Sequence, residues 1–191
     1  MINYLLAREM AGQSGLVEPR TQLELVAAAH NLFNQALFRG KWTRLKGWVS
    51  RRSPHLLNLK DVSAKRVIAS RHSVGTRVVE INKIQGSSGR VNDFDINFNP
   101  VQEHTEHRWQ NIAKAYLTGI TLPPVKLIEI DDTYFVEDGH HRVSVAKALG
   151  QLDIDAEVTV WDYLKPSQPS ALQPVCSQCC SSLLKGQLCC S

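Results

Sequence analysis

The feature that most constrains this chain is a short β-favouring run that leads through a glycine turn into a helix. A strand is predicted at 134–136 and a helix that includes residues 143–149 and stops at Gly150, because Asp138-Gly139 between them is typical of a turn. Arg142 therefore falls in the first helical turn. The helix prediction depends on apolar residues at three-residue spacing and on a glycine suited to end a helix: Val143, Ala146, Leu149 and Gly150.

The first turn of this predicted helix is suited to bind an anion. The first N–H groups of a helix have no partner within it, and the helix dipole is positive at this end. Arg142 adds a planar guanidinium that can donate two hydrogen bonds to a phosphate or carboxylate. The candidate phosphate-binding residues of this turn are Gly139, His140, His141, Arg142 and Ser144.

Three titratable residues surround this turn. His140 and His141 cannot both face one small ligand, because consecutive side chains diverge on a helix or a strand. A histidine that faces the ligand could donate to an oxyanion or carry a proton, and the other is expected to be buried and structural. Asp138 could bind a metal ion, accept a substrate proton or cap the following helix. Asp138 and His141 are the candidate catalytic residues.

A second glycine- and serine-rich loop occupies residues 86–90. Ser88, Gly89 and Arg90 are candidate phosphate contacts, because small residues let backbone N–H groups approach an oxyanion. The loop lacks the Gly-Lys-Ser/Thr ending of a Walker motif. If both loops converge, Asp93 or Asp95 could hold Mg²⁺ on a nucleotide or act as a base. The alternative is an ordinary turn in which these aspartates bond to nearby backbone N–H groups.

Together with Leu122-Pro123-Pro124-Val125, the strand, turn and helix over 134–150 resemble the ParB/sulfiredoxin family, and in particular short bacterial ParB-like proteins. Members of that family carry a Gly-x-x-Arg phosphate-binding turn between a strand and a helix, and Gly139-His140-His141-Arg142 matches it here. The resemblance covers roughly residues 77–161. It implies an α/β (α+β) fold with a mixed sheet and helices, which a helical N-terminal segment precedes here.

The family includes CTP-binding partition proteins, sulfinic acid reductases, free-serine kinases and proteins called ParB-like nucleases. His140 stands where the reductases have a cysteine, and the proline-containing stretch after Gly150 does not suggest a helix-turn-helix. The resemblance thus implies a pocket for a nucleoside triphosphate or diphosphate, with or without Mg²⁺, or for another phosphorylated small molecule. Hydrolysis or phosphate transfer could follow. The alternatives are a DNA-associated regulatory or partition-type module without catalysis and a ParB-like nuclease.

The N-terminal third of the chain is basic. No acidic residue occurs between Glu24 and Asp61, although the whole chain has a formal net charge of only +4. A helical hairpin interrupted at Gly40 is expected to pack on the core through apolar residues at helical spacing. The alternative is a basic face that binds nucleic-acid phosphates. This stretch contains the expected apolar stripe Trp42, Leu45, Trp48 and Val49 and the candidate nucleic-acid contacts Arg44, Arg51 and Arg52.

Four segments are predicted along the chain. They are a helical basic segment at 1–55, a connector with one short helix at 56–76, the ParB/sulfiredoxin-like domain at 77–165 and a Cys-rich tail at 166–191. Inside the domain the patterns predict strands at 77–84 and 154–161, a helix at 105–116 and a hairpin at 125–136.

All five cysteines belong to the tail: Cys176, Cys179, Cys180, Cys189 and Cys190. A reduced, disordered tail is expected, with a zinc site as the alternative. No metal site is predicted in the domain itself. The chain has no apolar run long enough to span a bilayer and no secretion signal, so a cytoplasmic location without membrane contact is expected.

Overall fold

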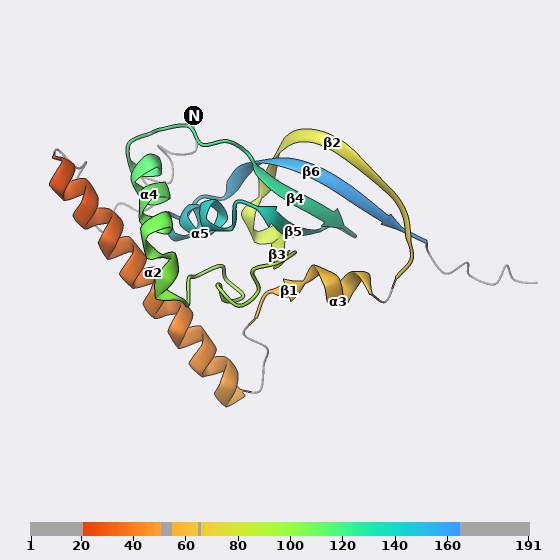
Figure 1. Cartoon of the computed structure of the whole chain (residues 1–191), viewed down its shortest axis with the longest axis horizontal. Helices are drawn as coiled ribbons and strands as arrows, with labels where there is room; N and C mark the ends of the chain where they lie inside the picture. The colour runs from red at the N-terminus through yellow and green to blue at the C-terminus, as the bar shows by residue number, and fades with distance from the viewer. Residues whose placement is uncertain (1–20, 51–54, 65, 165–191) are drawn as a thin grey trace, which may run out of the picture.

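The computed structural model describes residues 21–50, 55–64 and 66–164. A six-stranded mixed sheet in the order β1-β3-β5-β4-β6-β2 forms its centre, with helices on both sides (Figure 1). The strands are β1 (Leu57–Asn58), β2 (Ile68–Glu80), β3 (Ile84–Ser87), β4 (Val125–Ile130), β5 (Thr133–Asp138) and β6 (Asp153–Tyr163). The predicted fold class, a mixed α/β sheet preceded by an N-terminal helix, is confirmed.

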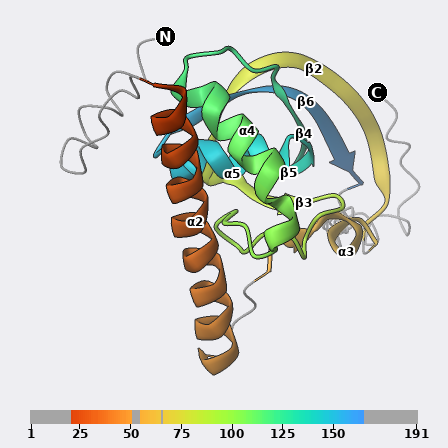
Figure 2. The same cartoon turned by 60° about the vertical axis from the view of Figure 1, so that its left-hand side comes forward.

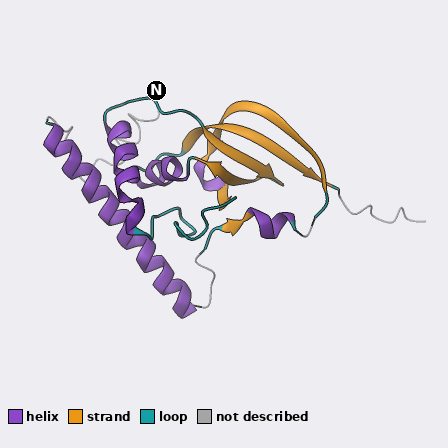
Figure 3. Cartoon of the chain, in the orientation of Figure 1, coloured by secondary structure: helices purple, strands orange, loops and turns teal. Residues whose placement is uncertain are grey.

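Figure 3 distinguishes the helices from the strands of the sheet by colour. The described residues contain four α-helices. They are α2 (Gln22–Ser50), α3 (Leu59–Ser63), α4 (Glu106–Leu117) and α5 (His140–Ala148), and two 3₁₀ turns cover Ile81–Lys83 and Glu103–Thr105. None of the helices in the described residues is both long enough and apolar enough to cross a membrane.

The side chains of the β4–β5 hairpin pack on both faces of the sheet. Asp131 and Asp132 form its turn with positive φ angles of 46° and 64°, which suit a tight two-residue connection. Alternate residues of these strands then face opposite sides. Val136 packs with Val143 of α5 on one face, whereas Phe135 packs with Leu59 of α3 on the other. The predicted hairpin, the helices at α4 and α5 and the last strand are confirmed.

Helix α2 is continuous from Gln22 to Ser50, so the predicted interruption at Gly40 and the helical hairpin are wrong. Gly40 is buried, and a Cβ atom added there would lie 2.4 Å from the carbonyl oxygen of Pro100. The glycine therefore permits a close approach of backbone to backbone and does not end the helix.

The two halves of α2 have different surroundings (Figure 2). Ala29, Phe33 and Ala36 in the first half are buried in a cluster with Trp109 of α4 and Val145 of α5. The second half continues past α4, and its apolar side chains are 48% to 80% exposed, so their predicted burial in the core is wrong. These exposed residues are Trp42, Leu45, Trp48 and Val49.

The connector expected at 56–76 contains much more regular structure than predicted. The short helix is present as α3, but β2 begins at Ile68 and pairs with β6 along its whole length. The strand predicted at 77–84 therefore begins earlier and ends at Glu80, before a 3₁₀ turn. The error has a physical cause: β2 is an edge strand with almost every side chain exposed, so no apolar alternation marks it.

Candidate anion-binding pocket

A small polar pocket of about 60 Å³ lies where β5 ends and α5 begins. Its other walls are the loop after β3 and one face of α4. Three guanidinium groups and two imidazoles line it, with a single carboxylate. The lining residues are Arg90, Arg108, Ile112, Asp138, Gly139, His140, His141 and Arg142.

Gly139 makes the turn into α5 possible. Its φ of 95° is in the left-handed region, and an added Cβ atom would lie 2.6 Å from Cγ1 of Val125. Any other residue would be both strained and in collision there. The sequence prediction of a turn followed by a helix start is confirmed, and α5 therefore presents its first N–H groups and positive dipole end to the pocket.

Arg142 is held inside the protein and is not the free clamp that the sequence suggested. Its Nη1 donates to the carbonyl oxygens of Pro123 and Pro124, the latter at 2.9 Å, and its Nη2 donates to Asp138 at 2.9 Å. The Arg142 side chain is only 12% exposed. Much of its hydrogen-bonding capacity therefore fastens the Pro123-Pro124 segment to α5, although its charge still contributes to the pocket.

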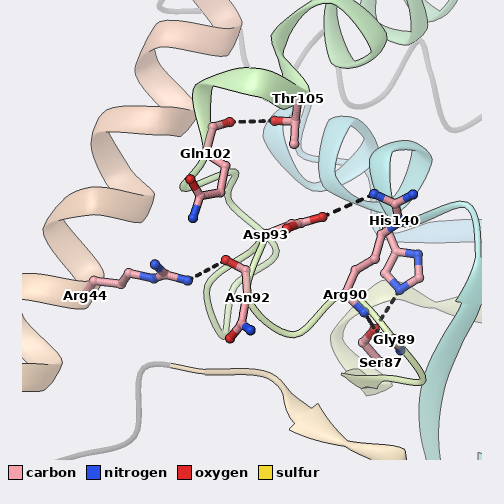
Figure 4. Close-up of polar contacts among 9 residues, drawn as sticks. All are labelled: Arg44, Ser87, Gly89, Arg90, Asn92, Asp93, Gln102, Thr105 and His140. Atoms are coloured by element: carbon pink, nitrogen blue, oxygen red, sulfur yellow. Dashed lines mark hydrogen bonds and ion pairs between the residues drawn. The ribbon is translucent and has the colours of Figure 1, made fainter.

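Ser87 connects the loop after β3 to α5, and this residue was not predicted (Figure 4). Its Oγ accepts hydrogen bonds from the backbone N–H groups of Gly89 at 3.2 Å and Arg90 at 2.9 Å, and lies 2.7 Å from Nε2 of His140. A hydroxyl accepts two bonds and donates one, so its hydrogen points to Nε2. His140 is then neutral with its proton on Nδ1. The signal available was the serine at the very end of a buried strand.

His141 has no such anchor. The residue is only 6% exposed, and its buried Nδ1 has no hydrogen-bond partner within the described part of the chain. Burial, followed by the charges of Arg108 and Arg90, lowers the pKa of His141 to about 4. Burial, followed by the charge of Arg90, likewise lowers the pKa of His140 to about 4. Both imidazoles are therefore neutral at pH 7, and both line the pocket, although only one was expected to face a ligand.

Arg90 and Arg108 supply the accessible positive charge. Both residues are exposed, and Nη1 of Arg90 makes an ion pair with Asp93 at 3.2 Å. Arg108 lies one helical turn before Ile112 on the face of α4 that borders the pocket. The sequence prediction included Arg90 and missed Arg108, because Arg108 belongs to a charged helix start that carries no motif.

Three predicted phosphate contacts lie outside the pocket lining. Ser144 is buried, and its Oγ accepts a hydrogen bond from Nε1 of Trp109 at 2.8 Å. The N–H group of Ser88 donates to the carbonyl of Val136. Gly89 contributes its N–H group to Ser87, so its backbone supports the loop. These residues act on the architecture around the pocket.

The two aspartates after this loop have structural partners. Asp95 is fully buried and accepts hydrogen bonds from the N–H groups of Asn97 and Asn99 and from the side chain of Asn99. It therefore forms the turn that was the alternative prediction. Asp93 pairs with Arg90. In the described residues no group of three or more metal-binding side chains is gathered.

The candidate nucleic-acid contacts are only partly described. Nη2 of Arg44 donates to the carbonyl oxygen of Asn92 at 2.6 Å, so this side chain bonds to the protein's own loop (Figure 4). Arg51, Arg52 and the Cys-rich tail lie outside the described residues.

Comparisons with known proteins add little beyond this geometry. No family model and no curated protein matches the chain. The chain is similar to the crystal structure of sulfiredoxin from Arabidopsis thaliana, with a TM-score of 0.34 and 19% sequence identity. The similarity covers 44% of this chain and 82% of that chain. At this level it says nothing about the chemistry of the pocket, which depends on this chain's own residues.

Proposed function

We propose that the protein binds a nucleotide or another phosphorylated small molecule at this pocket. The observation that carries the proposal is the charge of the lining: three guanidinium groups and a helix N-terminus surround a small space, and the single carboxylate is already paired with Arg142. A phosphate group placed there would accept hydrogen bonds from Arg90, Arg108 and the first N–H groups of α5.

The unpartnered Nδ1 of His141 supports the same proposal. A buried polar atom without a partner costs free energy, so a reorientation of this pocket-lining ring that brings Nδ1 to a ligand oxygen would be favourable. His141 is neutral at pH 7, so it can donate one hydrogen bond and accept another. Hydrolysis or phosphate transfer is the reaction we propose to look for, with His141 and Asp138 as the groups that move the proton.

We propose Mg²⁺ only as a companion of the nucleotide phosphates. The one carboxylate at the pocket is Asp138, whose side chain is 61% exposed and pairs with Arg142. A single shared carboxylate is a poor permanent site, but Mg²⁺ commonly uses one or two carboxylates together with substrate phosphates. Asp138 would then be the protein ligand.

The test is a calorimetric titration with CTP, ATP and ADP, each with Mg²⁺, on the full chain and on Arg108→Ala. We expect saturable binding that weakens at least about tenfold in the variant, because a charged hydrogen bond contributes about 1.5–3 kcal/mol. Arg71→Ala is the matched control, because it removes the same charge from the edge strand β2. Absence of binding to all three nucleotides and to inorganic phosphate would contradict the proposal.

A second candidate function is DNA association through α2. Phe38 and Trp42 stack with ring centroids 6.5 Å apart, and Lys46 lies 5.5 Å from the Trp42 ring, on an exposed face that also carries Arg39. Such a face could contact phosphates and bases. DNA binding that weakens with salt, and further in an Arg39→Gln, Lys46→Gln double variant, is the expected result. Unchanged binding in the double variant would exclude this face. For nuclease activity we find no cluster of acidic residues in the described chain.

Membership of the ParB/sulfiredoxin family also stays a proposal. The Gly139-His140-His141-Arg142 turn and the prolines that Arg142 holds support it. An experimental structure with a bound nucleotide would test family and ligand site together, because the phosphate should lie at the N-terminus of α5.

A further inference from the structure

The loop that carries Arg90 is fastened at its start to the sheet and to α5. Ser87, the last residue of β3, accepts hydrogen bonds from the N–H groups of Gly89 and Arg90, and its hydroxyl contacts His140. These bonds fix the backbone up to residue 90. They leave the Arg90 side chain, which is 46% exposed, without a contact that comes from this end of the loop.

The other end of the same loop is fastened to a distant helix. Arg44 of α2 donates to the carbonyl oxygen of Asn92 at 2.6 Å (Figure 4). The next residue, Asp93, forms an ion pair with Arg90 at 3.2 Å, and its N–H group donates to the carbonyl of Arg90. One chain of contacts therefore runs from Arg44 through Asn92 and Asp93 to the guanidinium of Arg90, which lines the pocket.

Arg44 is more than a surface residue that happens to touch the loop. Its side chain is half-buried, and its Nε is buried without a hydrogen-bond partner in the described residues, so Nε gives up contact with water where the side chain packs against the loop. A second tie lies one turn earlier, where Lys41 bonds Glu103 at 2.7 Å, but it leads to the start of α4 and not to Arg90. The two ties can therefore be tested against each other.

We infer that Arg44 is a positioning residue for the pocket: it fixes the Asn92 carbonyl, and through Asp93 it holds Arg90 where an anion binds. A long exposed side chain loses conformational freedom when it binds a ligand, and a loop already held in place reduces that loss. The affinity of the pocket then depends on α2, although α2 does not line it. This inference rests on the proposed function.

The first test needs no ligand. The charge of Arg90 is one of the causes that lower the pKa of His140, so release of Arg90 from the pocket should raise this pKa. NMR titration of the histidines from pH 7.5 to 3.5 should show His140 protonating at higher pH in Arg44→Ala and in Arg90→Ala. Lys41→Ala should leave the titration of His140 as in the wild type. An unchanged titration in Arg44→Ala would overturn the inference.

The second test is a double-mutant cycle on binding of inorganic phosphate and of ADP with Mg²⁺. Arg44→Ala should weaken binding about two- to tenfold, the cost of ordering one long side chain. In the Arg90→Ala background the same change should have no further effect, because it acts through Arg90. Arg44→Lys should restore part of the affinity, since a lysine can still donate to one carbonyl. Additive losses would overturn the inference.

The two tests also separate this inference from the proposed function. If the wild type binds neither these probes nor CTP or ATP, but the His140 titration responds to Arg44→Ala, the proposed function fails and the positioning of Arg90 stands. If the wild type binds both probes and Arg44→Ala binds them equally well, the positioning role fails and the proposed function stands. Thermal unfolding of each variant shows whether the fold is retained.

Discussion

The two walls of the pocket are built differently. On the α5 wall the polar groups are largely used by the protein itself: Arg142 bonds two proline carbonyls and Asp138, and Ser87 donates to His140. On the opposite wall Arg90 and Arg108 are exposed, and the ion pair of Arg90 with Asp93 is made through Nη1. The first wall holds the fold together, and the second has its charge available to a ligand.

The arginine that completes the sequence motif is therefore not the arginine whose guanidinium is most available to a ligand. Arg142 completes the Gly-x-x-Arg pattern and sits at the helix start, yet its guanidinium is mostly enclosed. Substitutions on the α5 wall should therefore change stability, whereas substitutions on the loop and α4 wall should change binding.

The largest expected effect is a loss of unfolding free energy at acid pH. The pKa of His140 and His141 is about 4 in the folded protein and about 6.5 when unfolded, so the unfolded chain takes up protons first as pH falls. The contribution of the neutral histidines to the unfolding free energy is fully present above pH 6.5. It is lost as pH falls towards 4, by on the order of 3 kcal/mol per histidine. Urea unfolding from pH 7.5 to 4 measures it. His141→Gln should lose part of this dependence, and the exposed His107→Gln should keep it.

Gly139→Ala should be the most damaging single substitution at the pocket. The positive φ and the 2.6 Å approach to Val125 together should cost about 3 kcal/mol or more of unfolding free energy. Gly89 is the matched control on the other wall, because its φ is ordinary and nothing lies within 4 Å of an added Cβ. Gly89→Ala should change stability by less than about 1 kcal/mol. Similar losses in both variants would contradict the contrast between the walls.

Substitutions of Arg142 and Arg90 should likewise differ in their effect on the unfolding free energy. Arg142→Ala removes a largely enclosed guanidinium from two carbonyls and a carboxylate, and should lower the unfolding free energy by about 2 kcal/mol. Arg90→Ala breaks one exposed ion pair and should lower it by less than about 1 kcal/mol. Chemical denaturation of both variants checks the order. A larger loss in Arg90→Ala would reverse our assignment of the walls.

The smallest expected effect is stabilisation by a ligand. Inorganic phosphate at ten times its dissociation constant should raise the unfolding free energy by about 1.4 kcal/mol, because it binds only the folded state. Arg108→Ala should lose most of this gain at the same phosphate concentration, and Arg71→Ala should keep it. Sodium chloride at equal ionic strength controls for the general effect of salt, and a gain unaffected by Arg108→Ala would place the phosphate elsewhere.

The parts of the fold that local patterns specify were predictable. Gly139 and Gly150 bound α5, and both adopt positive φ angles. The apolar residues between them have helical spacing and are mostly buried. The β4–β5 hairpin and α4 follow from equally local signals. These elements could be predicted because turn chemistry and periodicity act over only a few residues.

Predictions failed where distant residues decide the outcome. The stripe that includes Trp42 and Trp48 has the spacing of a buried helix face, but α2 continues past the helices that could cover it. Strand β2 has no apolar alternation, because it is stabilised by pairing with β6 at the edge of the sheet. Periodicity shows which residues share a face, and it cannot show whether anything lies against that face.

The sequence by itself determined the turn, the helix start and the presence of cations near them, because glycine conformations and helix N-termini follow from local chemistry. Only the tertiary structure decided which arginine bonds to the protein itself and which has its charge available in the pocket. It encloses Arg142 behind Pro123-Pro124, brings Arg90 and Arg108 from separate segments to the pocket, and connects Arg44 to the Arg90 loop. The physical reason is that a side chain's partners depend on which segments the folded chain places beside it.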